Sequence, residues 1–211
     1  MTTKVKICGL STAETMRATL DAGADFVGLN FYPKSPRYVS PEQAALLAAQ
    51  ARGRSKIVAL VVDAGDAMLK SISNAVRPDY FQVHGSETVE RVAEIARTFG
   101  VPVIKVIKIK EASDVAAAKA FKDVAEMILF EPKAPENLLP GGNGLAFDWN
   151  VLKGKDGQFM LAGGLNPDNV AEAIRLTRAP IVDVSSGVEN LPGKKDIALI
   201  RKFIERAKAA R

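Results

Sequence analysis

Cysteine and histidine each occur only once in this chain of 211 residues, and long apolar runs are absent. A single cysteine excludes a disulfide framework, and together with one histidine it is too little for a zinc site of the usual kind. No apolar stretch approaches the roughly 18 residues that span a bilayer, and the first residues, Met1 to Lys4, lack the apolar segment of a signal peptide. We therefore expect a soluble, cytoplasmic protein with no metal centre and no membrane partner.

Aromatic residues make up only 6% of the chain, and the basic excess is small, with 29 Lys and Arg against 24 Asp and Glu. Because the basic residues are dispersed, the sequence does not indicate a nucleic-acid partner. Apolar residues, at 47%, and charged residues, at 25%, have the proportions of an ordinary globular protein. We expect one domain over residues 1–211. The net charge of +5 serves either solubility or the attraction of a small anion.

Eight short runs rich in β-branched and apolar residues recur along the whole chain, roughly 22 to 32 residues apart. Their almost unbroken apolar character predicts strands that are covered on both faces, as in a parallel sheet. The runs are Lys4 to Cys8, Phe26 to Phe31, Lys56 to Val62, Asp79 to Val83, Val103 to Ile107, Met127 to Glu131, Gln158 to Ala162 and Ile181 to Ser185.

The intervening segments carry helix signals. Capping patterns begin at Ser11 and Ser40, and Asn166 precedes a proline at the expected start of another helix. Gly100 follows a segment with helical spacing and predicts a helix end. The stretch from Asp196 to Ala209 has an apolar stripe at helical spacing and is predicted to be the last helix.

Eight alternating units are compatible with a closed (β/α)8 barrel or with an open doubly wound sheet. The regular repetition favours closure. The turn after the first run also favours it, since it reads Cys8-Gly9-Leu10 and not the Gly-x-Gly-x-x-Gly of dinucleotide-binding sheets. The predicted fold class is therefore α/β, a single-domain (β/α)8 TIM barrel. Active sites in this fold lie at the carboxyl ends of the strands.

Two turns at the ends of the last two predicted strands have the composition of phosphate-binding loops. Gly163 and Gly164 follow the seventh strand, and Ser185, Ser186 and Gly187 follow the eighth. Glycines let backbone N–H groups approach an anion, and barrels often hold phosphate at these two loops. Each turn taken alone could be a simple tight turn. The pair predicts a phosphorylated ligand.

Cys8 ends the first predicted strand, at the rim where active-site residues are expected. A lone cysteine is commonly a small buried apolar residue. Its position before Gly9, with Lys4 and Lys6 nearby in the strand, raises the alternative of a thiolate that acts as base or nucleophile. The residue alone does not decide between these two roles.

A series of short motifs runs in order through nearly the whole chain. They are Lys6-Ile7-Cys8-Gly9-Leu10, Gly23-Ala24-Asp25, Ser35-Pro36-Arg37-Tyr38-Val39, Gln82-Val83-His84-Gly85, Gly141-Gly142-Asn143-Gly144, Phe147-Asp148-Trp149, Ala162-Gly163-Gly164-Leu165, Asp183-Val184-Ser185-Ser186-Gly187-Val188-Glu189 and Gly193-Lys194-Lys195-Asp196. Each motif is weak, but together they resemble the N-(5'-phosphoribosyl)anthranilate isomerase family of tryptophan biosynthesis. The resemblance implies a cofactor-free aldose–ketose isomerase that performs an Amadori rearrangement on a small phosphorylated substrate. We expect it to be a monomer.

The resemblance also implies catalytic roles for two residues. Cys8 falls on the family's general base, which requires either a lowered thiol pKa or a small ionised fraction that suffices. Glu131 falls on the family's general acid, where the family has Asp. The additional methylene can move the proton donor by about 1 Å, a displacement that can cost ~100-fold in rate. Either the surroundings absorb the extra length or the protein is impaired.

Four further residues are expected to bind substrate. Arg37 matches the family's second loop and suits the anthranilate carboxylate, and Asp183 is expected near the substrate amine or hydroxyls. His84 is either a substrate contact or a structural residue, and Gln82 should share its face of the strand. The glycine-rich stretch 140–144 is expected to form a lid.

Two other functions were weighed against this one. The related isomerase of histidine biosynthesis uses two Asp residues and two phosphate sites, but Cys8 replaces the first Asp and phosphate-type glycines occur once. A non-catalytic phosphate-binding barrel is the other alternative, and Glu131 is the feature in its favour. An assay that follows the loss of the substrate's anthranilate fluorescence would separate it from an isomerase.

Overall fold

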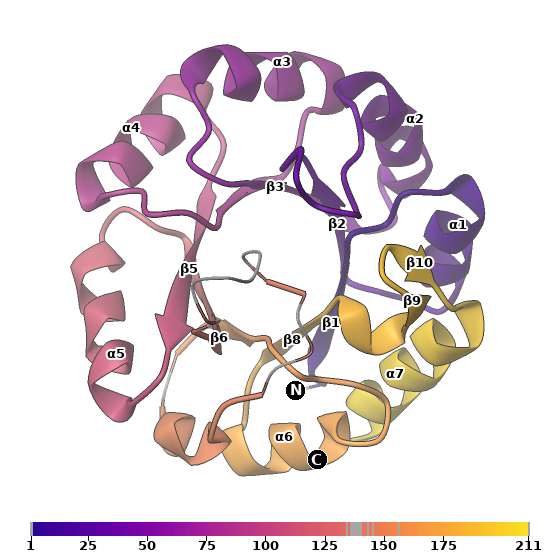
Figure 1. The fold of residues 1–211 in the computed structure, drawn as a ribbon, viewed down its shortest axis with the longest axis vertical. Coiled ribbons are helices and arrows are strands. Elements are labelled where there is room, and N and C mark those ends of the chain that lie inside the picture. The colour runs from indigo at the N-terminus through magenta and orange to yellow at the C-terminus, as the bar shows by residue number, and fades with distance from the viewer. Residues whose placement is uncertain are drawn as a thin grey trace.

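The computed structural model describes residues 2–210 except 134, 136–140, 143, 145 and 156. Its centre is a closed barrel of parallel strands, surrounded by a ring of helices (Figure 1). The strands follow one another around the barrel in chain order, and β1 closes on β8 through the pairing of Lys4 with Ile181. They are β1 (Lys4–Cys8), β2 (Phe26–Asn30), β3 (Lys56–Val61), β4 (Tyr80–Val83), β5 (Val103–Ile109), β6 (Met127–Pro132), β7 (Phe159–Leu161) and β8 (Ile181–Val184). The predicted (β/α)8 barrel is confirmed, and each predicted run coincides with one strand to within two residues.

The ring consists of α-helices and short 3₁₀ turns. The α-helices are α1 (Ala13–Asp21), α2 (Pro41–Ala51), α3 (Asp66–Val76), α4 (Val89–Phe99), α5 (Ala112–Ala117), α6 (Val170–Thr177) and α7 (Ile197–Ala209). The 3₁₀ turns are η1 (Ala118–Phe121), η2 (Trp149–Leu152) and η3 (Ser186–Val188). Among the described residues between β6 and β7, η2 is the one helical segment. A small antiparallel hairpin, β9 (Glu189–Leu191) and β10 (Lys194–Lys195), lies between β8 and α7 and was not predicted.

The helix ends follow the capping signals with two exceptions. Ser40 caps α2 by accepting from the N–H of Gln43, and Gly100 ends α4 in the left-handed conformation at φ 62°, as predicted. The predicted cap at Ser11 is wrong by one residue. Thr12 has the extended backbone of an N-cap and its hydroxyl accepts from the N–H of Thr15.

The predicted helix start at Asn166 is also wrong, since α6 begins four residues later at Val170. The side-chain oxygen of Asn166 accepts from the N–H groups of Asp168 and Asn169. Such an Asx turn competes with the helical hydrogen-bond pattern, and it delays the helix. The last helix agrees with the sequence, because Asp196 caps α7, which ends at Ala209.

The strands are covered on both faces, which explains their continuous apolar sequences. Side chains inside the barrel form one cluster, which includes Phe26, Val58, Ile104, Leu129 and Met160. Side chains on the outer face pack beneath the helices in a second, larger cluster. Burial of each such side chain stabilises the fold by roughly 1.5–3 kcal/mol, so the strand ends are held on a rigid frame. None of the helices in the described ranges is both long and apolar enough to cross a membrane.

Candidate active site

A cavity of about 550 Å³ lies at the carboxyl ends of the strands. Every site residue proposed from the sequence lines it, although these residues come from six different strands or the loops that follow them. They are Cys8, Arg37, Gln82, His84, Glu131, Gly163, Gly164, Asp183, Ser185, Ser186 and Gly187. The barrel therefore gathers residues that are widely separated in the sequence around one space.

Cys8 is the last residue of β1 and its side chain is buried. Burial raises the pKa of the Cys8 thiol, and the positive charges of Lys6 and Lys195 only partly oppose this. A Cβ atom on Gly28 of β2 would lie 2.8 Å from the Cys8 sulfur, so a larger residue there would displace it. Burial therefore favours the neutral thiol over the thiolate. Cys8 could act as a base either through a lowered pKa or through a small ionised fraction that suffices. The first of these conditions is not met.

A buried ion pair lies beneath the cavity. The Lys6 ammonium is 3.0 Å from a carboxylate oxygen of Asp183, and the Lys6 side chain is fully buried. Desolvation by burial lowers the pKa of Lys6, but the charges and hydrogen bonds of Asp183 and Cys8 together outweigh it, so the pKa lies above its ordinary value. The pair joins β1 to β8 and leaves the second carboxylate oxygen of Asp183 for other contacts.

His84 and Glu131 contact each other across the mouth. The Nε2 atom of His84 lies 2.5 Å from Oε1 of Glu131, and both side chains are more than nine-tenths buried. The other ring nitrogen of His84, Nδ1, is buried and has no hydrogen-bond partner among the described residues. Gly141 covers this pair so closely that a Cβ there would lie 2.7 Å from the His84 ring. This contact joins the side chains of β6 and the end of β4 across the cavity.

Gln82 and the candidate phosphate loops also present polar groups without partners among the described residues. The Gln82 amide oxygen is buried and lacks a partner among the described residues. The backbone N–H groups of Gly163 and Gly164 likewise make no hydrogen bond to a described residue. Gly187 packs against the preceding loop, because a Cβ on it would lie 1.9 Å from the carbonyl oxygen of Leu165. A buried acceptor without a partner is costly, so the Gln82 oxygen is suited to a polar group of a ligand.

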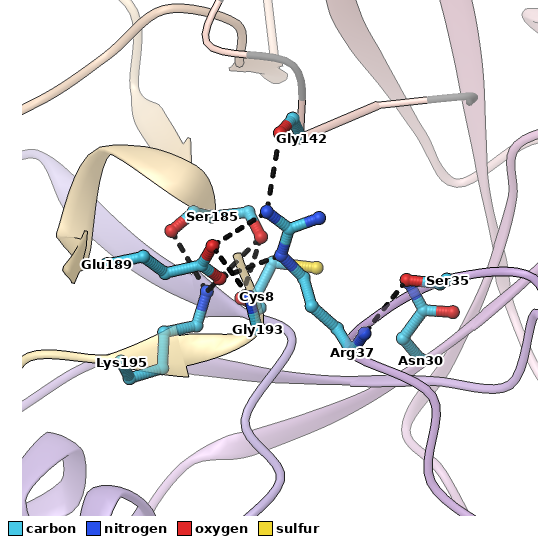
Figure 2. Close-up of polar contacts among 9 residues, drawn as sticks. All are labelled: Cys8, Asn30, Ser35, Arg37, Gly142, Ser185, Glu189, Gly193 and Lys195. Atoms are coloured by element: carbon cyan, nitrogen blue, oxygen red, sulfur yellow. Dashed lines mark hydrogen bonds and ion pairs between the residues drawn. The ribbon is translucent and has the colours of Figure 1, made fainter. Parts of the chain in front are cut away.

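Arg37 is already paired in this structure. Its Nε and Nη2 atoms each lie 2.7 Å from a carboxylate oxygen of Glu189, and Lys195 lies 2.7 Å from the same carboxylate (Figure 2). Sequence reasoning missed Glu189 and Lys195 as site residues. Both stand within the quoted motifs, but nothing in their spacing shows that a hairpin brings them to Arg37.

The expected lid can be described only in part, because residues 140 and 143 lie outside the described residues. Gly141, Gly142 and Gly144 line the cavity. No cluster of three or more metal-ligating side chains occurs in the described part of the chain.

The chain was compared with known proteins. The family model described as N-(5'-phosphoribosyl)anthranilate (PRA) isomerase matches residues 5–206. The chain is 49% identical to N-(5'-phosphoribosyl)anthranilate isomerase from Bradyrhizobium sp. (strain ORS 278), over 100% of this chain and 97% of the relative. It is 48% identical to the protein of that name from Mesorhizobium japonicum, over 100% and 98%.

Solved structures agree with these matches. The crystal structure of phosphoribosyl anthranilate isomerase from Thermotoga maritima superposes with a TM-score of 0.87, at 36% identity and 98% coverage of both chains. A second structure, in complex with reduced 1-(o-carboxyphenylamino)-1-deoxyribulose 5-phosphate, superposes with a TM-score of 0.84 at 34% identity and 98% coverage of both chains.

Proposed function

The chain belongs to the N-(5'-phosphoribosyl)anthranilate isomerase family, an enzyme family of tryptophan biosynthesis, and on that premise we propose that Cys8 is its general base and Glu131 its general acid. The reaction would convert N-(5'-phosphoribosyl)anthranilate to 1-(2-carboxyphenylamino)-1-deoxyribulose 5-phosphate. The observation that carries this proposal is that the only thiol of the chain and a buried carboxyl group line one cavity from different strands.

Glu131 would act first. Its carboxyl proton passes to the ring oxygen of the ribose, the bond from that oxygen to C1 breaks, and the anthranilate nitrogen supplies electrons to form a protonated Schiff base. His84 holds the Glu131 carboxyl group through the 2.5 Å contact. That contact takes up the longer side chain of Glu131, which supports a working acid in place of the family's Asp.

Cys8 would act second. As a thiolate it removes the proton from C2, and the electron pair moves toward the positively charged nitrogen to give an enolamine, which tautomerises to the ketone. Because burial raises the pKa of Cys8, only a small ionised fraction is present at neutral pH. The nearby Lys6 and Lys195 favour that fraction, and the charge of the protonated Schiff base would add to their effect.

The remaining residues would bind the two ends of a phosphorylated substrate. The backbone N–H groups of the loops 163–164 and 185–187 suit the phosphate, and Arg37 suits the anthranilate carboxylate. Gln82 and the second oxygen of Asp183 would meet the ribose hydroxyls. All these residues come from one barrel, so we expect a monomer to be active, which size-exclusion chromatography with an activity assay would test.

The experiment is a turnover assay on purified protein with freshly generated substrate, followed by the loss of anthranilate fluorescence. We expect turnover by the natural sequence and a loss of about 10³-fold or more in kcat for Cys8→Ser and Glu131→Gln separately. The reduced product analogue should still bind both variants. If either variant keeps near-normal kcat, that residue has no role in proton transfer.

A further inference from the structure

Glu189 binds two cations at the edge of the cavity (Figure 2). Its oxygen Oε1 accepts from Arg37 Nε and from Lys195 Nζ, both at 2.7 Å. Its oxygen Oε2 accepts from Arg37 Nη2 at 2.7 Å and from the N–H of Gly193 at 3.1 Å. Four donors therefore surround one carboxylate group, which fixes its position.

The three charged side chains are nearly inaccessible to solvent, at 8% exposure for Arg37, 4% for Glu189 and 1% for Lys195. Burial opposes the ionisation of Glu189, but the hydrogen bonds and charges of Arg37 and Lys195 outweigh it and hold the pKa of Glu189 below its ordinary value. One negative and two positive charges leave a net positive charge at this edge of the cavity. An anionic group of a ligand would neutralise it.

The backbone packs tightly around Arg37. A Cβ on Gly9, which follows Cys8 and has a φ of 79°, would lie 2.6 Å from Cδ of Arg37. A Cβ on Gly142 would lie 2.4 Å from its Nη1 atom. Such close approaches are possible only for glycine, so the guanidinium group is held on several sides.

Glu189 uses one edge of the guanidinium group, the edge formed by Nε and Nη2. On the opposite edge, Nη2 donates to the carbonyl of Gly142 at 3.3 Å, and Nη1 makes no hydrogen bond to a described residue. A neutral carbonyl at this distance is a weak acceptor, and a carboxylate would be a stronger one.

We propose that Glu189 is a positioning residue that grips one edge of the Arg37 guanidinium group, so that the opposite edge, bearing Nη1, binds the carboxylate of the substrate. Lys195 holds Glu189 in turn, and it also donates to the carbonyl of Ser185 at 2.9 Å, which ties this group to the candidate phosphate loop. The inference rests on the proposed function, in which Arg37 meets the anthranilate carboxylate. The alternative is that Glu189 competes with the substrate carboxylate for Arg37 and must be displaced before the substrate binds.

The test compares two ligands by calorimetry. One is reduced 1-(o-carboxyphenylamino)-1-deoxyribulose 5-phosphate, and the other is the same compound without the ring carboxylate. For Glu189→Gln we expect affinity for the first ligand to fall about 10-fold or more, and affinity for the second to change less than about 2-fold. KM should rise correspondingly, while kcat at saturating substrate stays within about 3-fold.

Four variants complete the design. Arg37→Met should show the same dependence on the ligand carboxylate, and Glu189→Asp, which keeps the charge, should recover part of the loss. Asp21→Asn removes one acidic partner from an exposed ion pair with Arg54, outside the site, and should leave both affinities unchanged. Lys195→Met provides a second disruption of the cluster if Glu189→Gln does not fold.

The outcomes separate the two proposals. If Arg37→Met weakens both ligands equally, or neither, Arg37 does not bind the carboxylate and that part of the proposed function fails. If Arg37→Met behaves as expected but Glu189→Gln and Lys195→Met do not alter carboxylate recognition, the positioning role is wrong. Tighter binding of the carboxylated ligand to Glu189→Gln would show competition and would also overturn the inference.

Discussion

The raised pKa of Cys8 predicts that catalysis depends steeply on pH. Burial is the largest cause of the shift, so the pKa lies above the ordinary thiol value of about 8.5. At pH 7 the thiolate fraction of the free enzyme is then below about 3%, which corresponds to a cost of at least about 2 kcal/mol for ionisation. If Cys8 is the base, and Glu131 keeps the carboxyl proton that the first step needs, kcat/KM should rise about tenfold per pH unit from pH 6 to 8.

Two assays measure this on the same residue. The fluorescence assay gives kcat/KM as a function of pH, and the rate of alkylation by iodoacetamide gives the thiolate fraction. Because the chain contains a single cysteine, alkylation reports on Cys8 alone, and Cys8→Ser serves as the blank. The two profiles should rise together. A labelling rate that is already constant at pH 7, or a kcat/KM that does not change while labelling rises, would refute the reasoning.

Ionisation of Cys8 should have opposite effects on activity and stability: it should raise kcat/KM but lower the free energy of unfolding. The folded state binds the thiol proton more tightly than the unfolded state, so this contribution is complete below the unfolded pKa of about 8.5. It is lost as pH rises through the higher folded pKa, by up to about 1.4 kcal/mol per pH unit. Urea titrations of the natural chain and Cys8→Ser should therefore diverge only in alkaline solution.

Further expected outcomes concern the acid, the buried ion pair and the phosphate loops. Glu131→Asp withdraws the carboxyl group by about 1 Å from its His84 contact and should lower kcat by up to about 100-fold. This loss should be smaller than that in Glu131→Gln. Equal kcat for Glu131→Asp and the natural chain would contradict the geometric argument. Lys6→Met leaves the buried carboxylate of Asp183 without its cation and should reduce the free energy of unfolding by about 3–5 kcal/mol in urea titrations. Lys56→Met, at an exposed ion pair, is the control and should have little effect. Gly187→Ala should reduce Tm and weaken phosphate binding because its Cβ overlaps a carbonyl. Gly65→Ala, at the N-cap of α3 where nothing lies within 4 Å, should leave phosphate binding unchanged.

The fold was largely predictable because both faces of each strand are buried. The apolar runs of an eight-stranded barrel are nearly continuous, as in β3, so they stand out from the polar loops around them. Competition between neighbouring polar side chains for backbone N–H groups was harder to predict. The side-chain oxygen of Asn166 forms a turn where the sequence indicated a helix start, and Thr12 takes the cap position beside Ser11. Both outcomes depend on which of two neighbouring polar groups captures a backbone N–H.

The position of the candidate site and most of its residues were predictable, but Glu189, Lys195 and the contacts between the side chains were not. Motifs at the strand ends placed Cys8, Glu131 and the phosphate loops at the mouth, because strand ends meet there. The pairing of Arg37 with Glu189 depends on a hairpin whose strands have three and two residues, too short to carry a periodic signal. Nor could the sequence indicate the direction of the Cys8 pKa, which results from burial opposed by two lysines.

The central claim is that Cys8 removes the proton from C2 of the ribose. A substrate deuterated at C2 tests it most directly, with release of the label into water followed in a single turnover at saturating enzyme. We expect the natural chain to release the label with turnover, and Cys8→Ser, which should bind the reduced product analogue equally well, to release it at least about 10³-fold more slowly. Equal release by the two proteins would contradict the role assigned to Cys8.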